Sequence, residues 1–298
     1  MEDTSLVLHH QDLEFTALTS GSADSSLPPI LCLHGFPDLP WTFRHQMKAF
    51  AEAGYYTICV RARGYEPSSQ PSNKDYSLGT MVTDIFAWLD ELNLAKVHLV
   101  GHDWGAILAY LAAAKQPKRF YSLSTLAIPH LGRLTKAIRK VPSQIFKSSY
   151  ITFFQFYGIA EMVIKFRKWA FIKRLWKKWS PTYTLEAEEW DKIRHCLEQK
   201  GVLKAMLSYY RQNMSLAVSI GLKKNEMASL KVVDVPTLAL TGVEDGCVDS
   251  RLHDFCFHEE DFPKGYRVER IPNAGHFLHL EQPEIVNQLL LDWFGRCT

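Results

Sequence analysis

The stretch LVGHDWGAI, residues 99–107, places an aspartate at a position where a reacting side chain is expected. Strand-like residues precede the two glycines of GHDWG and a helical pattern follows them. This outline is typical of a nucleophile elbow, a strained strand-to-helix turn that exposes one side chain. An Asp is ionised at neutral pH and needs no base to attack an electrophilic carbon. The sequence therefore predicts that Asp103 is a nucleophile that forms an alkyl ester.

Cleavage of such an ester needs a histidine that activates water and an acid that orients the histidine. The segment NAGHFLHLEQP supplies His276, which stands after a turn and shortly before the last helical pattern. The segment TGVEDGC follows a strand-like run and supplies Asp245, with Glu244 and Asp249 as rivals for the acid. We expect Asp103, Asp245 and His276 to form a triad.

The tetrahedral intermediate also needs hydrogen-bond donors for its oxyanion. The segment HGFPD follows the strand-like run ILCL and offers the backbone N–H of Phe36. The backbone N–H of Trp104 comes directly after the nucleophile and is the second expected donor. The sequence thus contains every group that an Asp nucleophile requires.

The elements that would position these groups alternate between strand and helix. Because short buried strands alternate with helices, we expect an α/β fold with a mostly parallel central sheet flanked by helices. Ligands of such sheets bind at the carboxyl ends of the strands, where the candidate residues should therefore meet. The strand-like runs are 30–35, 55–64, 97–101 and 237–242, and the helical patterns between them include 77–94 and 106–117.

The alternation stops after LAIPH (126–130) and resumes at DVPTLALTG. Long aromatic and basic helical stretches fill the interval. We therefore expect residues 131–228 to form an all-helical cap domain, inserted between the two parts of the α/β core at 1–130 and 229–298.

Taken together, the motifs resemble those of α/β-hydrolases, in the branch that contains epoxide hydrolases and haloalkane dehalogenases. HGFPDLPWTFRHQ resembles the epoxide hydrolase HGxP loop, RARGYEPSSQP resembles the RGYGxS segment, and GHDWG matches the elbow of the family. The order of nucleophile, acid and histidine is that of α/β-hydrolases. The resemblance covers nearly the whole chain and implies an α/β-hydrolase fold, Asp103 as nucleophile, Asp245 as orienting acid and His276 as base, with no cofactor and no metal.

Two tyrosines in the expected cap distinguish epoxide hydrolases from haloalkane dehalogenases. Opening an epoxide develops an alkoxide, and a phenol that hydrogen-bonds or protonates it lowers the barrier. The resemblance implies this role for Tyr150, in KSSYITFFQFYGIAE, and for Tyr210, in MLSYYRQN, with Tyr157 and Tyr209 as rivals. It therefore implies a hydrolase acting on ether bonds, an epoxide hydrolase that converts a small lipophilic epoxide and water into a vicinal diol.

Three further residues, His34, Pro37 and Gln155, are expected to border the substrate pocket. Two alternatives stay open. A haloalkane dehalogenase would use the same Asp103 nucleophile, although Phe36 stands where many dehalogenases have an Asn that binds halide. A non-catalytic binding protein of the α/β-hydrolase fold is the second alternative, but such proteins usually lose the elbow or the histidine.

Composition limits the partners and the compartment that we expect for the protein. With 34 Lys and Arg against 32 Asp and Glu, nothing favours a nucleic-acid partner. No apolar run approaches the ~20 residues of a membrane span, and the N-terminal segment lacks the pattern of a secretory signal. Six scattered cysteines without a CxxC pair predict buried thiols in a reducing compartment, hence the cytoplasm. The choice between a monomer and a homodimer is left open.

One local feature is unusual: KFRKWAFIKRLWKKW, residues 165–179, contains seven Lys or Arg. At helical spacing Trp169, Ile172, Trp176 and Trp179 share one face. The first interpretation is a cap helix that packs its tryptophans and solvates its charges. The second is a weak attachment to an anionic membrane surface, peripheral to the bilayer.

Overall fold

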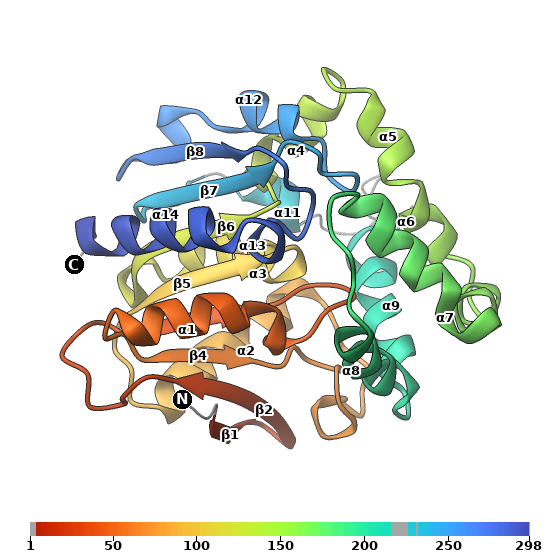
Figure 1. The fold of residues 1–298 in the computed structure, drawn as a ribbon, viewed down its shortest axis with the longest axis horizontal. Helices are drawn as coiled ribbons and strands as arrows, with labels where there is room; N and C mark the ends of the chain where they lie inside the picture. Colours follow the sequence, from red (N-terminus) through yellow and green to blue (C-terminus); the bar gives the residue numbers. More distant parts are fainter. Residues whose placement is uncertain (1–3, 216–225, 231, 298) are drawn as a thin grey trace.

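The computed structural model describes residues 4–215, 226–230 and 232–297. One eight-stranded sheet forms the centre, in the order β1-β2-β4-β3-β5-β6-β7-β8 (Figure 1). β1 pairs with β2 and β2 with β4 in antiparallel fashion, and the other neighbours are parallel. The strands are β1 (Thr4–His10), β2 (Leu13–Ser20), β3 (Ile30–Leu33), β4 (Thr57–Val60), β5 (Val97–His102), β6 (Phe120–Leu126), β7 (Thr237–Gly242) and β8 (Tyr266–Ile271).

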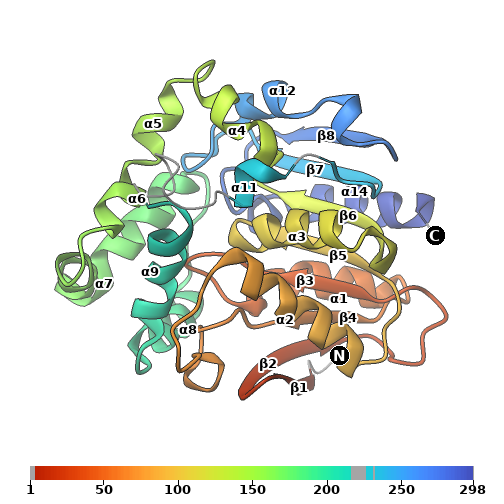
Figure 2. The same ribbon diagram turned by 180° about the vertical axis from the view of Figure 1, so that it is seen from behind.

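Helices cover both faces of this sheet. α1 and α14 lie on one face and α2 and α3 on the other, as the two opposite views show (Figures 1 and 2). The helices of this part are α1 (Arg44–Glu52), α2 (Leu78–Glu91), α3 (Trp104–Lys115), α11 (Glu226–Ser229), α12 (His253–Cys256), α13 (Leu278–Glu281) and α14 (Pro283–Arg296). The expected α/β fold with a mostly parallel sheet is confirmed.

The central strands form where the apolar runs are continuous. Every residue of β3, β4, β5 and β7 is buried, as expected for strands covered by helices on both faces. The sequence patterns missed the central strand β6, whose apolar run is broken by Ser122, Ser124 and Thr125. They also missed β1, β2 and β8, which lie at or near the two edges of the sheet. Burial alternates along β2, and β8 is only half-buried over most of its length, so neither contains a continuous apolar run.

Besides α11, six of the described helices lie between β6 and β7 in the sequence. We call them the inserted helices: α4 (Leu131–Ile138), α5 (Ser143–Lys147), α6 (Ser149–Phe154), α7 (Ile159–Trp179), α8 (Ala187–Glu198) and α9 (Val202–Asn213). They lie beyond the carboxyl ends of the parallel strands, at the right of Figure 1. Within residues 131–215 the structure contains no strand. Residues 216–225, which belong to the expected cap segment, lie outside the described residues.

α7 differs from the continuous amphipathic helix expected over 165–179. The backbone leaves the helical region at Phe166, where ψ is 144°, and the next three residues have φ values of 50°, 54° and 65°. The interruption divides α7 into two helical parts. Trp169, Ile172, Trp176 and Trp179 are nevertheless all buried, so their packing agrees with the first interpretation. Among the described residues, no helix has the length and apolarity to cross a membrane.

Candidate active site

The elbow lies between β5 and α3 and holds Asp103 in an unusual backbone conformation. Its φ is 51° and its ψ is −119°, a combination that costs a non-glycine residue about 1–3 kcal/mol. Close packing maintains the turn. A Cβ on Gly101 would lie 2.5 Å from the carbonyl oxygen of Gly105, and a Cβ on Gly105 would lie 2.0 Å from that of Leu33. Both glycines of GHDWG are therefore required for the turn to pack against β3.

The carboxylate of Asp103 is held from two sides. The backbone N–H of Phe36 donates to Oδ1 at 2.7 Å. Nε2 of His276 lies 3.5 Å from Oδ2. The loop after β3 approaches this closely because of Gly35, where a Cβ would lie 2.4 Å from Oδ1 of Asp103. The predicted nucleophile, one predicted oxyanion donor and the predicted histidine thus meet at one carboxylate.

Asp245, the acid predicted to orient the histidine, contacts His276 directly. Its Oδ2 lies 2.9 Å from Nδ1 of His276, and its Oδ1 accepts from the backbone N–H groups of Cys247 and Val248 at 2.7 and 2.8 Å. Both side chains of this pair are buried. The geometry supports Asp245 over its rivals.

The two rival acids are engaged elsewhere. Glu244 accepts a hydrogen bond from the backbone N–H of Ala274. Asp249 accepts from Arg251 and from the hydroxyl of Ser143. Neither contacts the histidine.

Burial and neighbouring charges set the ionisation of the site. Burial alone lowers the pKa of His276, but the charge of Asp245 and the contacts with Asp103 outweigh it and raise the pKa to about 10. Burial raises the pKa of Asp103, while its hydrogen bond and charge interaction with His276 bring the pKa below its usual value. At neutral pH an imidazolium therefore lies between two carboxylates.

The end of α7 fastens the loops that carry the acid and the histidine. The carbonyl oxygen of Trp179 accepts from the backbone N–H groups of Gly246 and His276, at 3.0 and 2.9 Å. A Cβ on Gly246 would lie 1.9 Å from the carbonyl oxygen of Lys178, and one on Gly275 would lie 2.5 Å from that of Trp179. The glycines beside Asp245 and His276 admit this backbone contact with the inserted helices.

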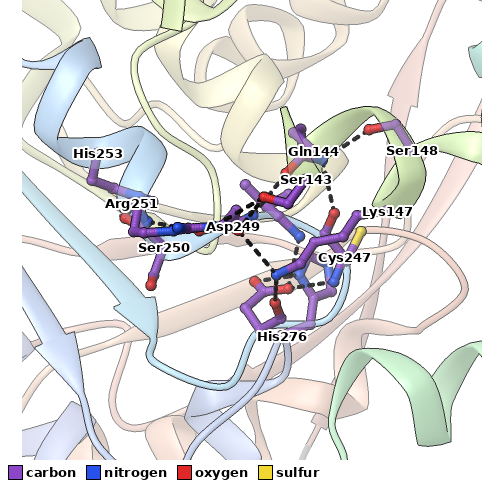
Figure 3. A network of polar contacts seen from close by, with 12 residues as sticks. Ser143, Gln144, Lys147, Ser148, Cys247, Asp249, Ser250, Arg251, His253 and His276 are labelled. Atoms are coloured by element: carbon purple, nitrogen blue, oxygen red, sulfur yellow. Dashed lines mark hydrogen bonds and ion pairs between the residues drawn. The ribbon is translucent and has the colours of Figure 1, made fainter. Parts of the chain in front are cut away.

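A second contact joins α5 to the acid loop, residues 245–251 (Figure 3). The side-chain amide of Gln144 donates to the carbonyl oxygen of Cys247 at 2.9 Å and to the hydroxyl of Ser148 at 2.8 Å. Its carbonyl oxygen accepts from the backbone N–H of Asp249 at 2.8 Å. No sequence pattern marked Gln144, because its role depends on α5 lying against a loop about a hundred residues later.

Tyr150 and Tyr210 come from α6 and α9 and lie together above the elbow. Their ring centroids are 5.8 Å apart, and the Tyr210 ring stands perpendicular to that of Trp104 at 5.0 Å. The hydroxyl of Tyr150 lies 3.5 Å from Sγ of Cys247, whereas the buried hydroxyl of Tyr210 has no hydrogen-bond partner among the described residues. Burial and the nearby charge of Asp103 raise the pKa of Tyr210 well above its usual value. Both phenols are therefore protonated donors.

The rival tyrosines point elsewhere. The hydroxyl of Tyr209 donates to the backbone carbonyl of Arg63 at 2.5 Å. The ring of Tyr157 is 73% exposed and packs against the guanidinium of Arg211. The structure thus brings Tyr150 and Tyr210, and neither rival, to the nucleophile.

A cavity of about 420 Å³ is lined by Asp103 and by both tyrosines. Apolar side chains form most of its wall, and about half of them come from α3, α4, α5 and α6. The polar groups that line it include Asp103, Tyr150, Tyr210, Gln144 and Cys247. Cys247 was quoted in the sequence only as part of the acid motif, and it is the cavity residue that contacts Tyr150.

The structure corrects the expected pocket wall, because His34, Pro37 and Gln155 do not line this cavity. The ring nitrogens of His34 contact the carbonyl oxygen of Gly35 and the N–H of Ala62, so this buried residue joins two loops. Pro37 follows a cis peptide bond and is also buried. Gln155 donates to the carbonyl oxygens of Ile151 and Tyr210, a bond that ties α6 to α9.

The second expected oxyanion donor, Trp104, begins α3 directly after the nucleophile. Its backbone N–H is therefore one of the free amide groups at a helix N-terminus. Among the described residues, no group of three or more His, Cys, Asp or Glu side chains has the arrangement of a metal site.

Comparison with known proteins agrees with this geometry. The family described as alpha/beta hydrolase fold matches residues 28–283. The chain is 30% identical to Epoxide hydrolase 4 of Mus musculus over 88% of this chain and 72% of the relative, and 30% identical to Epoxide hydrolase 3 of Xenopus tropicalis over 91% and 72%. The crystal structure of Bacillus megaterium epoxide hydrolase in complex with an inhibitor has a TM-score of 0.83 at 23% identity, covering 97% of this chain and all of that one. The chain belongs to the epoxide hydrolase family of α/β-hydrolases.

Proposed function

We propose that the protein hydrolyses an epoxide to a vicinal diol and that the inserted helices, with the rest of residues 131–228, act as the cap over the site. The observation that carries this proposal is the placement of two protonated phenols, Tyr150 and Tyr210, in the same cavity as the Asp103 carboxylate. The carboxylate is suited to attack at a carbon, and the phenols are suited to donate to the oxygen that leaves that carbon.

In the first step Asp103 attacks an epoxide carbon. One C–O bond of the ring breaks, an ester bond forms to the carboxylate, and the electron pair of the broken bond stays on the ring oxygen. Tyr150 and Tyr210 donate hydrogen bonds to this developing alkoxide, which takes a proton from one of the two phenols to become a hydroxyl, and that phenol regains a proton from solvent. The product is a hydroxyalkyl ester of Asp103.

In the second step a water molecule attacks the carbonyl carbon of that ester. His276 takes a proton from the water, and Asp245 stabilises the imidazolium that results. The backbone N–H groups of Phe36 and Trp104 bind the oxyanion of the tetrahedral intermediate, and the former already donates to Oδ1 of Asp103 at 2.7 Å. Collapse of the intermediate breaks the C–O bond to the alkyl group, and the leaving oxygen takes the proton from His276 to complete the diol. The carboxyl group left on Asp103 then gives its proton to His276, which restores the carboxylate. Every group used in both steps comes from the chain or from water.

All six cysteines are free thiols, and five of them are buried. This state is stable in a reducing compartment. We propose the cytoplasm as the compartment on that basis.

The test is a small panel of epoxides assayed for diols, with haloalkanes assayed for halide release. Asp103→Ala should abolish diol formation while the protein stays folded, and His276→Gln should accumulate the ester, seen as added mass on the intact protein. Tyr210→Phe should slow ester formation by about a hundredfold, the scale of general acid catalysis. The adjacent Tyr209→Phe is the matched control, because its hydroxyl contacts only the Arg63 carbonyl and should leave ester formation nearly unchanged.

Diol formation that survives Asp103→Ala would remove the proposed nucleophile. Halide release that is insensitive to Tyr210→Phe, without any diol formation, would instead identify a haloalkane dehalogenase. A wild-type protein with neither activity would favour the binding-protein alternative.

A further inference from the structure

The inserted helices carry an exposed apolar surface that the proposed chemistry does not use. On the first part of α7, Ile159, Met162, Val163 and Phe166 are 54%, 65%, 38% and 64% exposed. Their spacing of three and four residues places them on one face of the helix. Scattered single apolar residues are ordinary on a protein surface, whereas a stripe over two helical turns is not.

More exposed apolar residues lie on the neighbouring segments. Phe156 and Tyr157 directly precede α7, and Ile145 and Phe146 lie on α5. α5, α6 and the first part of α7 follow one another along the outer edge of the molecule, away from the sheet, in both views (Figures 1 and 2). We call these eight residues, from Ile145 to Phe166, the apolar edge.

The charge around the apolar edge is strongly positive. Residues 131–179 hold twelve of the 34 Lys and Arg of the chain but only one of its 32 Asp and Glu. That one acid, Glu161, is bound in an ion pair with Arg211 at 2.7 Å. Lys165, Arg167 and Lys168 flank Phe166 and are exposed. Arg133 and Lys147 pair with acids of other elements, whereas these three have no ion pair among the described residues. An apolar stripe beside such basic residues complements an anionic lipid surface, into which apolar side chains insert while cations contact the headgroups.

We propose that the apolar edge docks the protein on a lipid bilayer that contains anionic headgroups. This assignment moves the contact from the tryptophans of the predicted segment 165–179, which are buried, to the exposed side chains of α5 and the first part of α7. Only residues 165–168 of the predicted segment take part. The protein would lie on the bilayer and not across it. Docking on the bilayer needs no catalytic activity.

The docking surface adjoins the active-site cavity. Ile145 lines that cavity and is also 62% exposed, so the cavity wall reaches the surface within the apolar edge. A lipophilic epoxide dissolved in the bilayer would therefore pass directly into the cavity. This second part rests on the proposed epoxide hydrolase function, whereas docking itself does not.

The experiment is co-sedimentation of the full chain with vesicles of phosphatidylcholine, with and without phosphatidylserine, at low salt. The wild type should sediment more with the anionic vesicles. Met162→Asp with Phe166→Asp should lower binding to those vesicles at least tenfold, because it places charge on the apolar stripe. The matched control is Phe255→Asp with Ile285→Asp, on α12 and α14, where both side chains are 42% exposed. This control should bind like the wild type.

The basic contribution is tested separately. Lys165→Glu with Arg167→Glu should lower binding to anionic vesicles at least tenfold, since each cation near such a surface contributes roughly fivefold. The control with the same change of charge, Lys115→Glu with Lys118→Glu, lies at the end of α3 and beyond and should have a much smaller effect. Circular dichroism checks folding, and the charge variants test the site if the apolar variant fails to fold.

Equal sedimentation of the wild type with both kinds of vesicle, or unchanged binding of the edge variants, would overturn the proposal. Light scattering that shows a dimer dissociated by Met162→Asp with Phe166→Asp would overturn it in favour of self-association. With an active enzyme, the edge variants should raise KM for a vesicle-dissolved epoxide and leave KM for a water-soluble one unchanged. If the protein lacks epoxide hydrolase activity but still binds anionic vesicles, the proposed function fails and the docking proposal stands.

Discussion

Asp103 and His276 determine each other's charge. The imidazole lies between Asp103 and Asp245, and these carboxylates keep its pKa near 10 in the free protein. Formation of an ester would convert Asp103 into a neutral group. One of the two charges that hold the proton on His276 would then be gone, and the imidazolium would release that proton to solvent. The base would thus become available only after the nucleophile has reacted.

This dependence predicts different pH profiles for the two steps. Ester formation requires ionised Asp103, whose pKa is lowered, and a protonated Tyr210, whose pKa is raised, so its rate should be flat between about pH 6 and pH 9. Ester hydrolysis requires neutral His276, so its rate should rise with pH and level off above a pKa lower than 10. The amount of ester on the intact protein, measured by mass after rapid quenching, reports the rates of both steps. More ester at high pH than at low pH would contradict the mechanism.

At the scale of elements, the strands place the reacting groups and the inserted helices hold the loops in place. β5 ends at the elbow, and β7 ends just before the acid loop. The carbonyl oxygen of Trp179 accepts hydrogen bonds from both loops, and the side chain of Gln144 spans the acid loop. The core thus supplies the predicted triad, and α5 and α7 contact the loops that carry its acid and its histidine.

Gln144→Ala is predicted to disturb Asp245 through the acid loop. The substitution removes bonds to the Cys247 carbonyl and the Asp249 N–H and should slow ester hydrolysis about tenfold. Ester formation should change little, because Asp103 is held by the loop after β3. Accumulated ester on the intact protein is the readout. Ser148→Ala, which removes only one side-chain bond of Gln144, is the control, and an equal loss in both steps would contradict a positioning role.

At the scale of the whole molecule, an ion pair joins the core to the inserted helices. Arg44 begins α1 and donates to the carboxylate of Glu189 on α8, which also accepts from the hydroxyl of Tyr183 at 2.6 Å. Glu189 is buried. A buried pair is costly to break on one side only, because the remaining charge has no partner.

Arg44→Met should therefore lower the free energy of unfolding by about 3–5 kcal/mol, whereas Arg44→Met with Glu189→Leu should lose less than the single change. Urea unfolding of the two single variants and the double variant measures this coupling. If the double variant loses as much stability as the two single variants together, the interaction between the two side chains does not stabilise the fold. The expected non-additivity would identify it as a clamp between the inserted helices and the sheet.

Several features follow from the sequence alone. GHDWG, HGFPD, TGVEDGC and NAGHFLHLEQP each combine a reactive residue with the turn that presents it, so local spacing predicts both the chemistry and the strand ends. The strands β3, β4, β5 and β7 are equally readable, because burial on both faces favours continuous apolar runs. The edge strands β1, β2 and β8 are not, since half-burial leaves a weaker pattern.

The resemblance already implied Tyr210 and Asp245, but only the tertiary structure gives the physical reason for preferring them to Tyr209 and Asp249. It alone distinguishes cavity wall from structural support at His34 and Gln155. These differences depend on which way a side chain points after α5, α6 and α9 pack over the elbow, and neighbouring residues in a sequence point in different directions. The apolar edge of α5 and α7 also follows only from the tertiary structure. The sequence shows apolar and basic residues there, but not which of them the fold leaves in contact with solvent.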